Sequence, residues 1–315
     1  MDRLILPSAL ESCERVLVAG AGGGFDVFAG LPIYHRLRTI GKQVWLANLS
    51  FADLGLSDAP VLAPALYEVS ARTNSIDPYF PERTLARFLV RHFGEEPPIY
   101  AFSNTGVRPI RKAYEALQGR LDFDAVVLVD GGTDILMRGD ESGLGTPAED
   151  MASLAAVSGL DLRAKLVACV AFGVDTYSGV CHVNWLQNVA ALAVEGGFLG
   201  SISLLASMPE VQFYLDAVLT AERGAMGRES VVNACLASAI EGHFGNYHRT
   251  RRTSGSTLFI SPLMSLLWMF DLDSVVRQNF YLDRLVDTES HWDVLQAIAK
   301  FHHSVEHRTA VPVRL

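Results

Sequence analysis

The residues best suited to chemistry directly follow an apolar run. Phe123 to Val129 is a stretch of mainly branched apolar residues, which is typical of a buried parallel strand. Two carboxylates separated only by small residues come next and can converge on one cation or one polar ligand. A capped turn with solvated acids is the alternative. We predict a functional site that includes Asp130, Gly131, Gly132, Thr133 and Asp134.

A glycine-rich segment follows an earlier apolar run, Val16 to Ala19, and reads Gly20-Ala21-Gly22-Gly23-Gly24-Phe25-Asp26. It resembles a Rossmann phosphate loop, in which glycines permit a tight turn and a helix N-terminus attracts an anion. However, Phe25 stands in place of the last glycine, and Asn48 replaces the acid that would bind a ribose. NAD(P) and S-adenosylmethionine are therefore not favoured. Anion or carboxylate binding at Gly22, Gly23 and Gly24, or a structural turn, stays open.

Other polar segments also follow predicted strands, and the carboxyl ends of parallel strands share one edge of a sheet. Ser103, Asn104 and Thr105 are candidate ligand-binding residues at this edge. Asp175 and Asp26 could complete an oxygen-rich shell with Asp130 and Asp134, of the kind that Mg²⁺ or Mn²⁺ prefers. The alternative is an ammonium group held by the same acids. The predicted metal ligands are Asp130, Asp134 and Asp175.

His182 is the candidate general base, because it lies in the loop after the fifth predicted strand. Histidine has an unperturbed pKa of about 6.5, which suits proton transfer near neutral pH. A packing or capping role is the alternative.

Apolar strands alternate with amphipathic helices along most of the chain, which predicts an α/β fold with a doubly wound, mostly parallel, Rossmann-like sheet. The predicted strands are Val16–Ala19, Val44–Leu49, Ile99–Phe102, Phe123–Val129, Leu166–Phe172 and Phe198–Leu204. Residues 1–315 are expected to form a single domain, with 209–315 as a mainly helical C-terminal extension packed on it. In this extension Thr257–Ile260 is ambiguous, and Thr309–Val313 is a candidate terminal strand.

The composition narrows the class of protein. Half of the 315 residues are apolar and 19% are charged, as in an ordinary globular chain, and the net charge of -9 disfavours nucleic acid as a partner. The four cysteines form no CxxC pair, which suits reduced thiols. No signal peptide or spanning segment is recognised, so we expect a cytoplasmic protein without a membrane partner. Apolar C-terminal helices would support a homodimer.

Three segments together resemble an uncharacterised bacterial and archaeal family, domain of unknown function 1152. They are Gly22 to Pro32, Asp130 to Asp134 and Arg138-Gly139-Asp140-Glu141. This resemblance covers most of the chain and implies no established activity. A local resemblance to D-glutamate cyclase type domains rests on Asp130, Gly131, Gly132, Asp134, Met137 and Gly139, and implies a small amino-acid or carboxylate substrate.

These patterns favour an enzyme that acts on a small carboxylate- or phosphate-bearing metabolite, such as an amino acid, in a cleft at the strand ends. A lyase, cyclase or hydrolase would need only metal-binding acids and a base. Two alternatives remain open. One is an oxidoreductase or transferase that binds NAD(P) or S-adenosylmethionine, and the other is a non-catalytic metabolite-binding protein.

Overall fold

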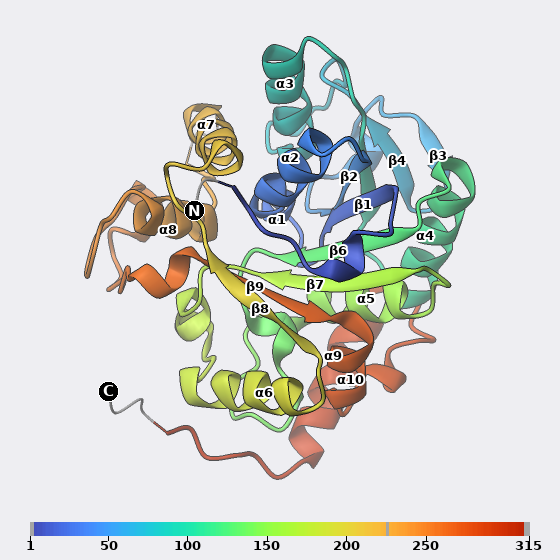
Figure 1. The fold of residues 1–315 in the computed structure, drawn as a ribbon. Coiled ribbons are helices and arrows are strands. Elements are labelled where there is room, and N and C mark those ends of the chain that lie inside the picture. Colours follow the sequence, from blue (N-terminus) through green and yellow to red (C-terminus); the bar gives the residue numbers. More distant parts are fainter. Residues whose placement is uncertain (1–2, 225–226, 312–315) are drawn as a thin grey trace.

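The computed structural model describes residues 3–224 and 227–311. Its centre is a nine-stranded sheet in the order β3-β4-β5-β2-β1-β6-β7-β9-β8 (Figure 1). The middle five strands, from β5 to β7, are parallel, and the strands at both edges pair antiparallel. The strands are β1 (Arg15–Gly20), β2 (Gln43–Ser50), β3 (Val61–Ala63), β4 (Leu66–Val69), β5 (Ile99–Ser103), β6 (Ala125–Asp130), β7 (Ala164–Cys169), β8 (Phe198–Ser203) and β9 (Leu266–Asp271).

Helices cover both faces of the sheet, so the middle strands bury side chains on each side. In β1, Val16 and Val18 belong to one core and Leu17 and Ala19 to the other. One face carries α1 (Asp26–Ala29), α2 (Leu31–Thr39), α3 (Pro81–Phe93), α7 (Pro209–Gly224) and α8 (Val231–Ile240). The other carries α4 (Val107–Leu121), α5 (Pro147–Ser158), α6 (His182–Val194), α9 (Leu272–Gln278) and α10 (His291–Ser304). The predicted doubly wound α/β fold is confirmed.

The edges of the sheet differ from the expectation. β9 lies within the segment that was expected to be mainly helical, and it inserts between β7 and β8. Its apolar run, Leu266 to Phe270, is too short for periodicity to separate a strand from a buried helix. Ile260, from the ambiguous segment, makes only an isolated bridge to Gly245. Residues 309–311 form no strand, and the rest of that predicted strand lies outside the described residues.

The order of the parallel strands creates a topological switch point. The chain proceeds from β1 to β2 and β5 on one side, and then crosses to β6 and β7 on the other. β1 and β6 are neighbours, with Gly20 in register with Val129, so the segments after both strands emerge at the same edge. Ligands bind at such a point in open α/β sheets.

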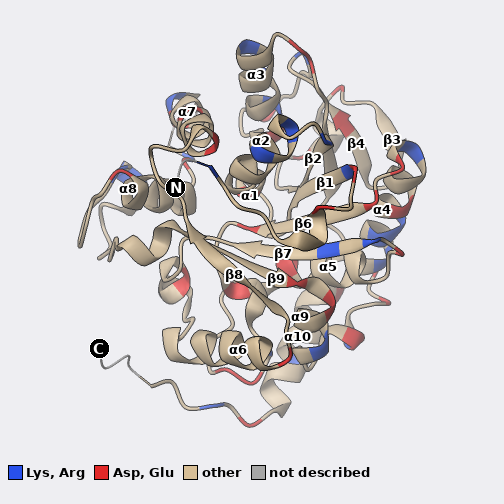
Figure 2. Cartoon of the chain, viewed as in Figure 1, with Lys and Arg blue, Asp and Glu red and all other residues tan. Residues whose placement is uncertain are grey.

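Charged residues lie mainly on helices and loops, and the central strands carry few of them (Figure 2). Asp130, the last residue of β6, is an exception. Among the described residues, no helix combines the length and the apolar character needed to cross a bilayer.

Candidate functional site

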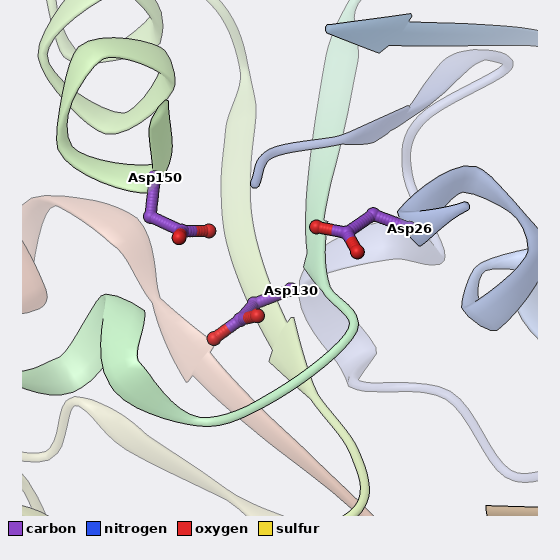
Figure 3. A group of neighbouring side chains, drawn as sticks. All are labelled: Asp26, Asp130 and Asp150. Carbon is purple, nitrogen blue, oxygen red and sulfur yellow. The ribbon is translucent and has the colours of Figure 1, made fainter. Parts of the chain in front are cut away.

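Three carboxylates meet at the switch point (Figure 3). Asp26 is the first residue of α1, Asp130 ends β6, and Asp150 lies in the first turn of α5. One oxygen atom of each lies within 4.8 Å of the others. Asp130 and Asp150 are each 3% exposed, while Asp26 is partly exposed. The topology therefore brings together acids from three separate elements.

The glycines beside these acids leave room for them. The Gly22 amide donates to Asp26 Oδ2 at 2.8 Å. A Cβ atom at Gly22 would lie 2.7 Å from that same oxygen and 2.8 Å from Asp150 Oδ1, and one at Gly131 would clash with Asp26 Oδ1. Any larger residue at either position would displace a carboxylate.

The charge of the cluster is not balanced by protein groups. Burial raises the pKa of Asp26 to about 7, and it raises the pKa values of Asp130 and Asp150 well above their usual range, with the neighbouring acids adding to each effect. No lysine or arginine among the described residues forms an ion pair with these three acids. Asp150 Oδ1 is buried and accepts no hydrogen bond. The cluster thus lacks the counter-charge that buried carboxylates ordinarily need.

Asp134 and Asp175, which were predicted to be metal ligands with Asp130, each tie a loop in place. Asp134 Oδ2 accepts a hydrogen bond from the Thr146 amide at 2.6 Å. Asp175 Oδ2 accepts from the amide and the hydroxyl of Thr133, at 2.7 and 2.9 Å. Burial and the charge of Asp134 raise the pKa of Asp175 to about 8. Both acids therefore add negative charge around Asp130, with one oxygen each engaged by the backbone.

Two buried side chains support the loops that carry the acids. Ser153 of α5 donates to the Ala21 carbonyl at 2.7 Å, which joins the helix of Asp150 to the turn that precedes Asp26. Trp185 Nε1 of α6 donates to the Thr133 carbonyl at 2.8 Å. Such outer contacts orient the groups that would touch a ligand.

Asn104, at the end of β5, approaches the cluster through Glu149. Its Nδ2 atom donates to Glu149 Oε1 at 3.2 Å, and His291 Nε2 lies 3.6 Å from the same oxygen. The charge of Glu149 acts on both Asp26 and Asp150. The neighbouring candidates Ser103 and Thr105 contact each other, with the Thr105 hydroxyl 3.4 Å from the Ser103 carbonyl.

His182 is not brought to the carboxylates. It begins α6, and its ring packs on Phe172 with 4.9 Å between centroids. Burial lowers its pKa, and no acid is among the causes. Nε2 is buried beside Gly173 and has no hydrogen-bond partner. Its surroundings correspond to the packing role that the sequence left open.

One amide of the glycine-rich turn is engaged within the chain. The Gly22 amide donates to Asp26 Oδ2 and is not free for an external anion. Asn48 is fully buried, and its Nδ2 atom donates to the Gly24 carbonyl at 2.8 Å and to Glu82 Oε1 at 2.7 Å. A carboxylate of the chain thus accepts from one of the amides that a phosphate loop would offer to an anion.

Sequence reasoning missed Asp150, Glu149 and His291. The segment Pro147-Ala148-Glu149-Asp150 has a complete explanation as a helix start, because proline and acids favour the first turn. The nearness of this segment to the Asp130–Asp134 loop was the only available signal. His291 begins a helix far along the chain, and only tertiary packing brings it to Glu149.

A family model described as "Protein of unknown function (DUF1152)" matches residues 55–308. Asp130 and Asp150 lie within the matched segment, and Asp26 precedes it. Neither curated proteins nor solved structures gave a significant match, so the D-glutamate cyclase resemblance gains no support.

Proposed function

The chain belongs to DUF1152, a family of proteins of unknown function, and from its site we propose an enzyme that uses Mg²⁺ or Mn²⁺ to act on a small carboxylate- or phosphate-bearing metabolite. The proposed metal ligands are Asp26, Asp130 and Asp150. This set retains Asp130 from the sequence prediction and adds Asp26 and Asp150, because one oxygen of each of these three acids lies within 4.8 Å of the others. Among the described residues, Asp134 and Asp175 lie outside this group.

The observation that carries the proposal is the unpartnered carboxylate of Asp150. Its Oδ1 atom is buried without a donor among the described residues. One oxygen of this carboxylate lies within 4.8 Å of an oxygen of Asp26 and an oxygen of Asp130. Burying like charges without compensation is costly, whereas a divalent cation would neutralise all three acids. Because the donors are all oxygen atoms, the site suits hard cations such as Mg²⁺ and Mn²⁺ better than thiolate-seeking metals.

The acids also determine what kind of substrate can enter. A free anion would be repelled by the carboxylates, so an anionic metabolite would approach only a charge-neutralised site. When bound, the metal would supply the positive charge that attracts and polarises such a substrate. The partly exposed Asp26 marks the open side of the cluster.

Proton transfer is assigned to Glu149 and His291 in place of His182. These two side chains lie 3.6 Å apart beside Asp150, and both are partly exposed. Asn104 orients Glu149 through its hydrogen bond. A lyase, cyclase or hydrolase would require no further protein groups.

We propose that the protein is cytoplasmic, and its cysteines support this. Cys13, Cys169, Cys181 and Cys235 are all free thiols, which suits a reducing compartment. The proposed partner is the metabolite alone, with a homodimer as the candidate assembly.

The test measures Mn²⁺ binding to metal-free protein by calorimetry and by electron paramagnetic resonance. We expect one site, and we expect Asp150→Asn and Asp130→Asn to weaken binding by about 100-fold or more, since each removes a ligand charge. Asp283→Asn, at an exposed acid outside the cluster, is the matched control and should bind as the natural protein does. Absence of binding at millimolar Mn²⁺, or equal binding by Asp150→Asn, would refute the metal site.

A thermal-shift screen of metabolites with and without Mg²⁺ or Mn²⁺ then tests the enzyme. We expect a metal-dependent ligand that is converted, with turnover lost in Asp130→Asn at an unchanged melting temperature. A ligand that binds with the metal but stays unchanged on long incubation would indicate a binding protein. Stabilisation of the metal-free protein by NAD(P) or S-adenosylmethionine would favour the nucleotide-binding alternative.

A further inference from the structure

Helices α3 and α7 pack against each other on one face of the sheet (Figure 1). A basic groove is lined by residues of both helices. Its volume is about 680 Å³. Among the described residues, no acid lines it, and four arginines do: Arg83, Arg87, Arg91 and Arg223. This concentration of positive charge is unusual in a chain with a net charge of -9.

The arginines of α3 form one stripe along the groove. Arg83, Arg87 and Arg91 are spaced four residues apart, which places them on the same side of a helix. Like charges at this spacing destabilise a helix, and Arg223 faces them from α7 where a carboxylate would relieve the repulsion. The arrangement is unfavourable for folding alone and favourable for an anion in the groove.

Backbone contacts hold two of these side chains in position. Arg87 Nε donates to the Ala71 carbonyl at 3.0 Å, and Arg91 Nε donates to the Arg87 carbonyl at 3.3 Å. Arg83 lies 5.3 Å from the ring centre of Phe80. None of the four arginines has an ion pair with a described residue. The terminal nitrogens of Arg87 and Arg91 are therefore left for another acceptor.

Nearby acids are committed to other arginines. Glu222, next to Arg223 in the chain, pairs with Arg249 at 2.7 Å. Asp77 pairs with Arg228 at 3.4 Å. Asp77 and Asp58 do favour the charged form of Arg83, but burial and the charge of Arg87 outweigh them and lower its pKa. The groove thus stays positive although acids are close to its rim.

We propose that this groove binds a small molecule that carries a pyrophosphate or phosphate-ester group. Guanidinium groups match the geometry of phosphate oxygens with paired hydrogen bonds. The volume falls within the range of about 300–1,000 Å³ that is typical of small-molecule sites. A long polyanion or an anionic membrane would also meet the acidic remainder of the chain, which disfavours both.

The groove adjoins a smaller pocket of about 190 Å³. The two cavities share Pro78, Thr84 and Gly224. The smaller one is lined by Phe25, which directly precedes Asp26. Phosphate binding in the groove nevertheless uses residues that are separate from the metal site, so it does not depend on the proposed function.

The experiment is calorimetric titration of pyrophosphate into protein freed of metal on a chelating resin, at low salt. We expect saturable binding that the double variant Arg87→Glu/Arg91→Glu weakens by about tenfold or more. The matched control is Lys112→Glu/Lys300→Glu, at exposed positions of α4 and α10, which gives the same change in net charge. It should weaken binding by about twofold or less. The single variant Arg223→Glu, on the other helix, should also weaken binding. It serves as the test if the double variant folds poorly.

No pyrophosphate binding by the natural protein would overturn the proposal. An equal loss in the lysine control would also overturn it, because general electrostatics would then explain the binding. Phosphatidylserine vesicles and a single-stranded RNA complete the test. Tighter binding of either one that pyrophosphate does not displace would assign the groove to that partner instead.

Discussion

Glu141, on the connection between β6 and α5, and Asp150, in the first turn of α5, are two buried carboxylates with opposite surroundings. Glu141 accepts hydrogen bonds from the Gly139 amide at 2.8 Å and from Asn188 Nδ2 at 2.7 Å, and it forms an ion pair with Arg308. Asp150 is almost as buried, yet no described residue donates a hydrogen bond to its Oδ1 atom or forms an ion pair with it.

The contrast separates acids that hold the fold from acids that serve a ligand. A buried charge is stable in a folded protein when donors and a counter-charge surround it, and Glu141 has both. Asp150 has neither, although the same segment of chain supplies partners to Glu141. A carboxylate that is buried without hydrogen-bond donors or a counter-charge is a candidate functional group. This criterion distinguishes Asp150 from Glu141, whereas burial alone does not.

The largest expected effect is on the stability that the partners of Glu141 provide. Arg308→Met should lower the free energy of unfolding by about 3 kcal/mol, because it leaves Glu141 charged and buried without its cation. Urea denaturation measures the loss, and Glu141→Gln in the same background should restore part of it. Mn²⁺ affinity of the folded fraction should not change. A loss of Mn²⁺ binding in Arg308→Met would mean that the two regions are not independent.

The next largest effect is the stabilisation that Mn²⁺ should give at the carboxylate cluster of Asp150. Mn²⁺ at 100 times its dissociation constant should raise the free energy of unfolding by about 2.7 kcal/mol, and a chelator should reverse the gain. Asp150→Asn should remove the response, whereas Glu141→Gln should retain it. Equal stabilisation of the natural protein and Asp150→Asn would place the metal elsewhere.

The central fold could be predicted because its strands are buried on both faces. Apolar runs such as Phe123 to Val129 require burial on both faces, and their alternation with helices predicts parallel pairing through right-handed crossovers. The order of the strands was not predicted. β9 could not be predicted in the same way. Its position depends on pairing with β7 and β8, which are remote in the chain, and its short apolar run fits a buried helix equally well.

The site divides along the same line. Asp130 ends β6 and Asp26 begins α1 after the turn that follows β1, so the sheet itself brings them to one edge. Asp150 reaches that edge only because α5 packs with its first turn against the switch point, and a helix start already explains its sequence. His182 is a polar residue that the sequence suggested for the site. Although it follows a strand in the chain, it begins helix α6 and its ring packs on Phe172.

Glu82 provides an intermediate case between the two carboxylates. It is fully buried and accepts a hydrogen bond from Asn48, and burial raises its pKa from 4.5 to about 7. Between these values the folded protein retains a proton that the unfolded chain has lost, so stability present below pH 4.5 is lost as the pH rises to 7. Glu82→Gln keeps an acceptor for Asn48 and should flatten this loss, which amounts to at most about 1.4 kcal/mol for each pH unit. Urea denaturation between pH 4.5 and 7 measures this loss of stability. If stability fell with pH equally steeply in Glu82→Gln, Glu82 would not be its cause.

The smallest expected effect tests whether the support of Asp150 is specific to the site. Ser153→Ala removes the hydrogen bond to the Ala21 carbonyl and should cost about 1 kcal/mol of stability. Ser238→Ala is the matched control, because Ser238 is equally buried and donates to the Ala234 carbonyl at the same 2.7 Å. Both variants should lose similar stability in urea. Only Ser153→Ala should also weaken Mn²⁺ binding, by about tenfold, since it loosens the tie between the helix of Asp150 and the turn before Asp26. If Mn²⁺ affinity fell equally in both, the loss would reflect general stability, and Ser153 would belong with the scaffold around Glu141.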